Sequence, residues 1–117
     1  MKNSILCERS YSFALRIVKL CKKLREMREY IFADQILRCG TSIGANLAES
    51  KCAQSRADFL AKVSISYKES NECLYWLNLL ADSEILSREL LEPLIDECCE
   101  IVKMLSATQL TMKKQRE

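Results

Sequence analysis

Hydrophobic residues recur along the chain at steps of three and four, the spacing that places side chains on one face of an α-helix. Four such stretches follow one another, near residues 4–28, 32–52, 56–81 and 88–111. Each stretch predicts an amphipathic helix that buries one face. The positions predicted to face a core are Phe13, Ile17, Leu20, Leu24, Met27 and Ile31; Ile36, Gly40, Ile43 and Leu47; Val63, Tyr67, Ser70, Leu74, Leu77 and Ala81; and Leu91, Leu94, Cys98, Ile101, Leu105 and Thr108.

Short polar segments set the ends of the predicted helices. Ser55 and Asp58 have the spacing of a capping box, in which both side chains bind free backbone N–H groups at a helix start. Pro93 lies inside the last apolar pattern and predicts either a kink or a later start of that helix. The polar tail, residues 113–117, is expected to fray.

Four amphipathic helices with short connections hide their apolar faces most compactly in an up-down-up-down antiparallel bundle. No stretch alternates in the manner of a β-strand, and no linker or internal repeat divides the chain. With 117 residues, there is room for one hydrophobic core. We therefore predict an all-α fold in which residues 1–117 form a single four-helix-bundle domain.

The composition removes several classes of chemistry. The sequence contains no histidine, which excludes the serine triad, the histidine-containing zinc sites and the most common general base. Two glycines and one proline are too few for a turn-rich β-sandwich or barrel. No nucleophile with an adjacent base is visible in the sequence, so we expect no enzymatic activity, no metal site and no cofactor.

Cysteine usage and the lack of a targeting pattern indicate a reducing compartment. The cysteines are odd in number, none forms a C-x-x-C pair, and most occupy apolar positions of helical patterns, where a reduced thiol acts as a small hydrophobe. Metal or redox chemistry is the alternative. There is no signal-peptide pattern and no uncharged run of about 20 residues, so we expect a cytoplasmic protein without a membrane partner. The seven cysteines are Cys7, Cys21, Cys39, Cys52, Cys73, Cys98 and Cys99.

The net charge of +2 conceals two strongly charged segments of opposite sign. Residues 1–28 carry eight basic and two acidic side chains, a local charge of +6. Residues 82–100 carry one basic and seven acidic side chains, a local charge of −6. Opposite charges on separate segments pair either within one molecule or between neighbouring copies. In the second case, the basic first helix of one subunit would meet the acidic fourth helix of the next.

Basic residues form a ridge on the predicted first helix. Arg9, Arg16 and Lys23 recur every seven residues, with Lys19 and Lys22 beside them. The ridge is either a solvated face, a surface for phosphate groups of RNA or DNA, or a surface for an acidic partner. Aromatic residues do not interleave with it, so base stacking is not expected. Binding of nucleic acid would then be sequence-tolerant backbone contact that weakens steeply with salt.

The second predicted helix contains an unusual run of small residues, 39–46. Each of its glycines costs about 1 kcal/mol relative to alanine in a helix interior. Gly40, Gly44 and Ala48 recur every four residues, which indicates close packing against another backbone. A phosphate-binding loop is the alternative, but no lysine follows in the P-loop pattern.

Polar residues on the second and third predicted helices are expected to meet. Four of them share one face of the second helix, and two glutamates are neighbours on the third. We expect a buried polar network or a subunit contact, in which Arg38 pairs with a glutamate. The alternative is an all-carboxylate metal site, which the positive charge of Arg38 would oppose. The six residues are Arg38, Ser42, Asn46, Glu49, Glu69 and Glu72.

Tyr75 and Trp76 are adjacent, so both side chains cannot point into one core. We expect one to pack inward and the other to lie at a groove or a subunit contact. Large aromatic residues frequently anchor interfaces, and a partly exposed core edge is the alternative.

Several of these segments together resemble a known family over about residues 10–110. The family is that of the four-helix-bundle proteins named for 23S rRNA intervening sequences. The resemblance lies in Gln35-Ile36-Leu37-Arg38, Thr41-Ser42-Ile43-Gly44-Ala45-Asn46-Leu47-Ala48-Glu49, Ser55, Asp58-Phe59, Lys68-Glu69, Glu72 and Tyr75-Trp76-Leu77.

The resemblance implies an antiparallel four-helix bundle that assembles into a homo-oligomeric ring, typically a pentamer. Some members of this family are encoded inside intervening sequences of large ribosomal RNA genes. A related branch supplies accessory proteins of diversity-generating retroelements, whose strongly basic ring binds a reverse transcriptase and nucleic acid. The present chain is less basic, with an isoelectric point of about 8.2.

Residues and resemblance together predict a non-enzymatic, ring-forming scaffold or adaptor for nucleic acid or a nucleic-acid enzyme. The rival interpretation is a protein-interaction module without a nucleic-acid role.

Overall fold

The protein is all-helical, as the apolar periodicity predicts. The structure, a computed structural model, describes the backbone of residues 2–116 and the side chains of residues 5–115. It contains four helices: α1 (Lys2–Glu26), α2 (Tyr30–Ser50), α3 (Arg56–Asp82) and α4 (Arg88–Arg116). Residues 2–116 include no β-strand and no helix long and apolar enough to cross a membrane.

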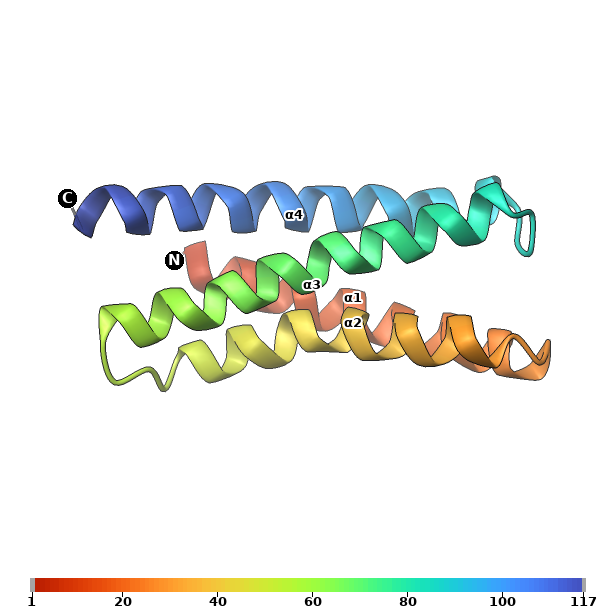
Figure 1. Ribbon diagram of the computed structural model, residues 1–117, viewed down its shortest axis with the longest axis horizontal. Helices are drawn as coiled ribbons and strands as arrows, with labels where there is room; N and C mark the ends of the chain where they lie inside the picture. Colours follow the sequence, from red (N-terminus) through yellow and green to blue (C-terminus); the bar gives the residue numbers. More distant parts are fainter. Residues whose placement is uncertain (1, 117) are drawn as a thin grey trace.

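The helices lie alongside one another along a molecule that measures 47 × 21 × 21 Å (Figure 1). Figure 1 also shows the chain turning back at each of the three connections. Packing contacts join α1 to α2, α2 to α3, α3 to α4 and, less extensively, α4 to α1. These contacts enclose one hydrophobic core and agree with a bundle.

Most positions of the predicted core stripes are buried, and Leu20, Tyr67, Leu74 and Thr108 are partly buried; only the end of the first stripe is exposed. Phe13, Ile17 and Leu24 are buried, whereas Met27 and Ile31 are 42% and 74% exposed. The expectation that these last two residues face the core is wrong because α1 ends at Glu26. The chain then turns through Arg28, whose φ is 65°, so residues beyond it no longer continue the helical phase of α1.

Short-range sequence signals set the first residues of α3 and α4. Ser55 is the N-cap of α3 and its Oγ accepts a hydrogen bond from the backbone N–H of Asp58 at 3.0 Å, while the Asp58 carboxylate accepts from the N–H of Gln54. α4 begins at Arg88, where the apolar pattern places its start, and continues through Pro93, so of the two alternatives for Pro93 the later start is wrong.

α4 also continues to Arg116, five residues beyond its predicted end, so the segment from residue 113 to 116 is helical. Polar contacts with α3 support this extension: Gln109 donates to Ser64 at 2.7 Å, and Arg56 donates to Gln115 at 2.5 Å. The expectation that the tail frays is wrong for these residues. The polar composition of the tail does not reveal the contacts, because their partners lie some 50 positions earlier in the chain.

Gly40 packs directly against α1. A Cβ at this position would stand 2.8 Å from Cγ2 of Ile17, which is fully buried. Gly44, one turn later, would place a Cβ no closer than 3.6 Å to Ser10, an ordinary contact. The close packing predicted from the small residues is therefore strictest at Gly40.

Four of the seven cysteines, one from each helix, belong to the core. Cys21, Cys39, Cys73 and Cys98 are buried, and all the cysteines are free thiols. Hydrogen bonds with Cys39 and Cys98, together with burial, raise the pKa of the Cys73 thiol well above its ordinary value. Burial raises the pKa of Cys21 to about 11. The Cys21 and Cys73 thiols therefore act as protonated packing groups.

We expect Gly40→Ala to lower the free energy of unfolding by about 1–3 kcal/mol, because the new methyl group overpacks against Ile17. Gly44→Ala is the matched control and should stabilise the protein by about 0.5–1 kcal/mol through helix propensity alone. Urea denaturation of both variants measures the difference. Equal effects at the two positions would contradict the close approach at Gly40.

Stability should fall between pH 9 and pH 11. The folded state holds protons on its buried thiols that the unfolded state releases, so the folded state binds more protons and loses stability as the pH rises. One such thiol contributes at most about 1.4 kcal/mol per pH unit within this window. Cys21→Val should flatten the pH profile of chemical denaturation. Cys52→Val, at an exposed thiol, is the control; an equal flattening in both would argue against burial as the cause.

Candidate functional site

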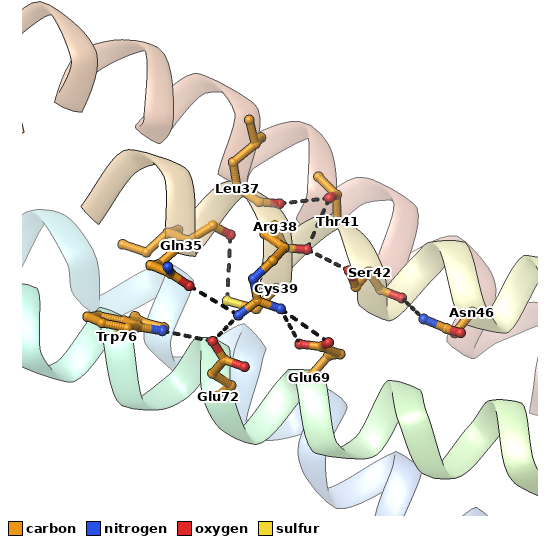
Figure 2. A network of polar contacts seen from close by, with 11 residues as sticks. Gln35, Leu37, Arg38, Cys39, Thr41, Ser42, Asn46, Glu69, Glu72 and Trp76 are labelled. Atoms are coloured by element: carbon orange, nitrogen blue, oxygen red, sulfur yellow. Dashed lines mark hydrogen bonds and ion pairs between the residues drawn. The ribbon is translucent and has the colours of Figure 1, made fainter. Parts of the chain in front are cut away.

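Arg38 joins α2 to α3 through two glutamates (Figure 2). Its Nη1 lies 3.1 Å from Oε2 and 3.3 Å from Oε1 of Glu69, and its Nη2 donates to Glu72. Nη2 also donates to Oε1 of Gln35 at 3.2 Å. The Glu72 carboxylate accepts a second hydrogen bond, at 3.0 Å, from the indole N–H of Trp76. Five side chains thus form one network across the α2–α3 seam.

This network lies at the surface of the seam. The Arg38 side chain is 46% exposed, and those of Glu69 and Glu72 are 20% and 37% exposed. Burial lowers the pKa of Arg38, but the hydrogen bond with Glu69 and the charges of both glutamates outweigh it, so the pKa is raised. The guanidinium occupies the space between the carboxylates, where the metal-site alternative would place a cation. The arrangement suits a clamp that fixes helix register.

The remaining residues of the predicted network lie elsewhere. Ser42 donates to the backbone carbonyl of Arg38, and Asn46 donates to that of Ser42, so both bind their own helix. Glu49 forms a separate ion pair with Lys62 at 2.9 Å. Of the six residues, Arg38, Glu69 and Glu72 therefore belong to the network, Ser42 and Asn46 form bonds within α2, and Glu49 joins α2 to α3 through a second, separate ion pair.

Gln35 and Trp76 join the network although the pattern of charges did not identify them as members. Gln35 precedes Arg38 by three residues, and Trp76 follows Glu72 by four, so helical spacing is the signal that connects them. Trp76 is half-buried and packs edge-on against Phe32, with ring centroids 5.9 Å apart. Tyr75 points outward and is 61% exposed.

The predicted basic ridge divides into paired and unpaired cations. Arg9 binds Glu97 of α4 through two hydrogen bonds of 2.6 and 3.0 Å, and this interaction raises its pKa. At this point the basic and acidic segments pair within one molecule. The other four cations are exposed and form no ion pair among side chains 5–115. They are Arg16, Lys19, Lys22 and Lys23.

Helical spacing spreads these four cations across the exposed face of α1. Arg16 and Lys23 follow Arg9 by seven and fourteen residues and therefore share its edge, toward α4. Lys22 follows the exposed Tyr11 by eleven residues, three turns, and lies on the edge toward α2. Lys19 lies between the two edges. From residue 16 to residue 23, the exposed face of α1 is therefore basic across its width, whereas the exposed Glu8 and Glu26 lie on the line of Lys19 before and after this segment.

We expect Glu72→Ala to lower the free energy of unfolding by about 1 kcal/mol, because it removes an acceptor from both Arg38 and Trp76. Trp76 is the single tryptophan, so its fluorescence reports the seam directly during denaturation. Asp34→Ala, which removes the exposed partner of Arg25, should cost less than about 0.5 kcal/mol. A larger loss of unfolding free energy in Asp34→Ala than in Glu72→Ala would contradict the stabilising role of this network.

Comparison with known proteins identifies the family. The profile of the 23S rRNA-intervening sequence proteins matches residues 2–107. A protein with unknown function from the S23 ribosomal protein family of Bacteroides thetaiotaomicron, known from a crystal structure, shares 46% sequence identity with this chain. The two structures superpose with a TM-score of 0.89, and the match covers 93% of this chain and 98% of that chain. No curated protein matches. Because the profile covers nearly the whole sequence, the chain belongs to the 23S rRNA-intervening sequence protein family.

Proposed function

We propose that this protein is a non-enzymatic helical scaffold that self-associates into a ring, typically of five subunits, and binds the backbone of nucleic acid or a nucleic-acid enzyme. The observation that carries the proposal is the exposed face of α1, where four cations have no ion pair among the described side chains. The free cysteines support a reducing, cytoplasmic location.

The scaffold in this proposal is an up-down-up-down antiparallel bundle. Contacts between α2 and α3 support this direction, since Arg38 meets Glu69 whereas Glu49, later in α2, meets Lys62, earlier in α3. The reversal of the chain at each connection in Figure 1 agrees with it. In such a bundle the exposed face of α1 runs along a rigid rod.

A rigid row of cations suits phosphate groups better than bases. Lysine and arginine side chains release condensed counterions when they contact phosphates, which gives affinity without sequence preference. The only large aromatic side chain exposed on the described part of α1 is Tyr11, so the face has no platform for successive bases. Repetition of the face around a ring would raise avidity without strengthening any single contact.

We expect the triple variant Arg16→Glu, Lys19→Glu, Lys23→Glu to bind labelled single-stranded RNA or duplex DNA at least 10-fold more weakly than the parent in fluorescence anisotropy. With about four phosphate contacts, raising the salt concentration from about 50 to 200 mM should weaken duplex binding by the parent about 100-fold. The matched control, Lys68→Glu, Lys103→Glu, Lys113→Glu, changes the net charge equally on α3 and α4 and should bind as the parent does.

Absence of binding at low ionic strength would overturn the nucleic-acid role. It would leave the protein-interaction module, whose partner would remain captured after nuclease treatment. Equal losses in the two triple variants would show that total charge, rather than the face of α1, governs binding.

A further inference from the structure

An apolar pocket lies at the end of the bundle where α1 begins and α4 ends. It has a volume of about 400 Å³, which is within the range of sites that bind small molecules. Its floor consists of Leu6, which is buried, and of Phe59 and Met104, which are half-buried. Its walls are formed by Ile5 of α1 and by the last turns of α4, as far as Gln115. We call this recess the α1–α4 pocket.

The pocket exists because α1 and α4 pack on each other less extensively than the other neighbouring helices do. At its inner end the two helices are joined by the ion pair between Arg9 and Glu97, and Nη1 of Arg9 also lies 3.5 Å from Sδ of Met104. This ion pair closes the pocket on the side of the bundle centre. In the other direction α4 projects past the start of α1 (Figure 1), so the pocket opens outward.

The shape of the pocket favours a narrow, extended ligand. From Met104 to Gln115 the lining follows about three turns of α4, or about 16 Å. An extended aliphatic chain rises about 1.25 Å per carbon, so about 12 carbons span this length. Met104 and Met112 are flexible and polarisable, so they can adapt to such a chain. A partner's helix, about 10 Å in diameter, is too wide to enter between two helices that an ion pair joins.

The charge at the outer end of the pocket selects the head group. Arg56, the first residue of α3, reaches across to α4, where its Nη2 donates to Oε1 of Gln115 at 2.5 Å. This partner is neutral, and neither Arg56 nor the exposed Lys113 and Lys114 form an ion pair among side chains 5–115. The acid that follows Arg56 on α3 is Asp58, whose carboxylate accepts a hydrogen bond from a backbone N–H group. The outer end is therefore positive.

The inner end of the pocket has no such excess of charge. Arg9 is neutralised by Glu97, and Glu100 lies 3.7 Å from Lys103 of its own helix. Glu8 lies on the other flank of α1, where it lines a groove toward α2. A ligand that fits both ends therefore has an apolar tail and an anionic head.

We propose that the α1–α4 pocket binds a fatty-acid-like anion, with its aliphatic chain along Met104 and Met112 and its carboxylate at Arg56. The chain would remove the apolar floor from water, which is the main source of affinity. The guanidinium offers paired N–H donors that suit a carboxylate, and Gln115 holds it at the mouth of the pocket. This site is separate from the exposed face of α1, so the inference goes beyond the proposed scaffold and does not depend on it.

NMR spectra of protein labelled with methyl-¹³C methionine test the inference directly. Met104 and Met112 line the pocket, whereas the exposed Met27 lies just beyond the other end of α1 and serves as an internal control. The probe is dodecanoate, and the comparison is dodecyltrimethylammonium, which has the same chain and a positive head. We expect dodecanoate to shift the signals of Met104 and Met112, with saturation below about 1 mM, and to leave Met27 unchanged.

Two comparisons of ligands report the chain and the head separately. The cationic amphiphile should bind about 10-fold more weakly than dodecanoate, because it brings a positive charge to Arg56. Decanoate, which is shorter by two methylene groups, should also bind about 10-fold more weakly than dodecanoate, because it buries less apolar surface.

Two substitutions at exposed positions make the same separation in the protein. Ala107→Trp fills the pocket and should abolish the shifts, whereas the control Ala61→Trp, at an exposed alanine of α3, should not. Arg56→Gln removes the charge at the mouth and should weaken dodecanoate binding about 10-fold, whereas Lys68→Gln, also on α3, should not. Circular dichroism verifies that the helices of each variant still form.

Unchanged signals of Met104 and Met112 at about 1 mM dodecanoate would overturn the inference. So would an equal shift at Met27, which would show unspecific association with exposed apolar side chains, or binding that survives in Ala107→Trp. Equal affinity for the two head groups, or an Arg56→Gln variant that binds as the parent does, would overturn the assignment of an anionic ligand. The anisotropy measurements decide nucleic-acid binding separately.

Discussion

The packing of α2 between α1 and α3 is the constraint on which the rest of the structure depends. On one side, Gly40 brings the backbone of α2 against the fully buried Ile17 of α1. On the other, the buried Ser66 of α3 donates to the backbone carbonyl of Ile43 at 2.7 Å. Both contacts need a small residue at the interface, Gly40 on α2 and Ser66 on α3. Rotation of α2 about its axis, or larger side chains at these positions, would break the close packing. The position of every outward side chain on α2 follows from this.

Two surface features of α2 are consequences of that fixed rotation. With Gly40 and Ile43 facing inward, Arg38 is directed to the α3 seam, where it meets Glu69 and Glu72. Thr41 and Ala45 then lie on the outer side next to α1, where they line a shallow groove between α1 and α2. The run of small residues thus serves two purposes: it permits the close approach and leaves a recess on the surface.

The sequence predicts the core better than the surface, for a physical reason. Burial repeats along a helix, so stripes such as Ile36, Gly40, Ile43 and Leu47 are visible from spacing alone. The stripe fails at Met27 and Ile31 because the turn at Arg28 changes the helical phase, and a turn is a local event that periodicity does not encode.

Ion pairing across helices is harder still to predict because it depends on register. The ion pair between Arg38 and Glu69 is predictable from the sequence, since both residues belong to polar faces of adjacent helices. Arg9 with Glu97 was not, because residues 88 positions apart meet only after the first and last helices are brought together. The local charge of +6 on residues 1–28 therefore overstates what the surface offers to a partner.

The division of cations on α1 allows assembly and nucleic-acid binding to coexist in the proposed scaffold. Lys22 lies on the edge of α1 toward α2, whereas Arg16 and Lys23 lie on the edge toward α4. A subunit contact that covers the first edge would leave the second edge open. Neutralisation of Lys22 by an acidic neighbour would also reduce repulsion between like charges that a ring brings together. Assembly would thus concentrate the open edges of several subunits on one particle, where each needs only weak contact with phosphate.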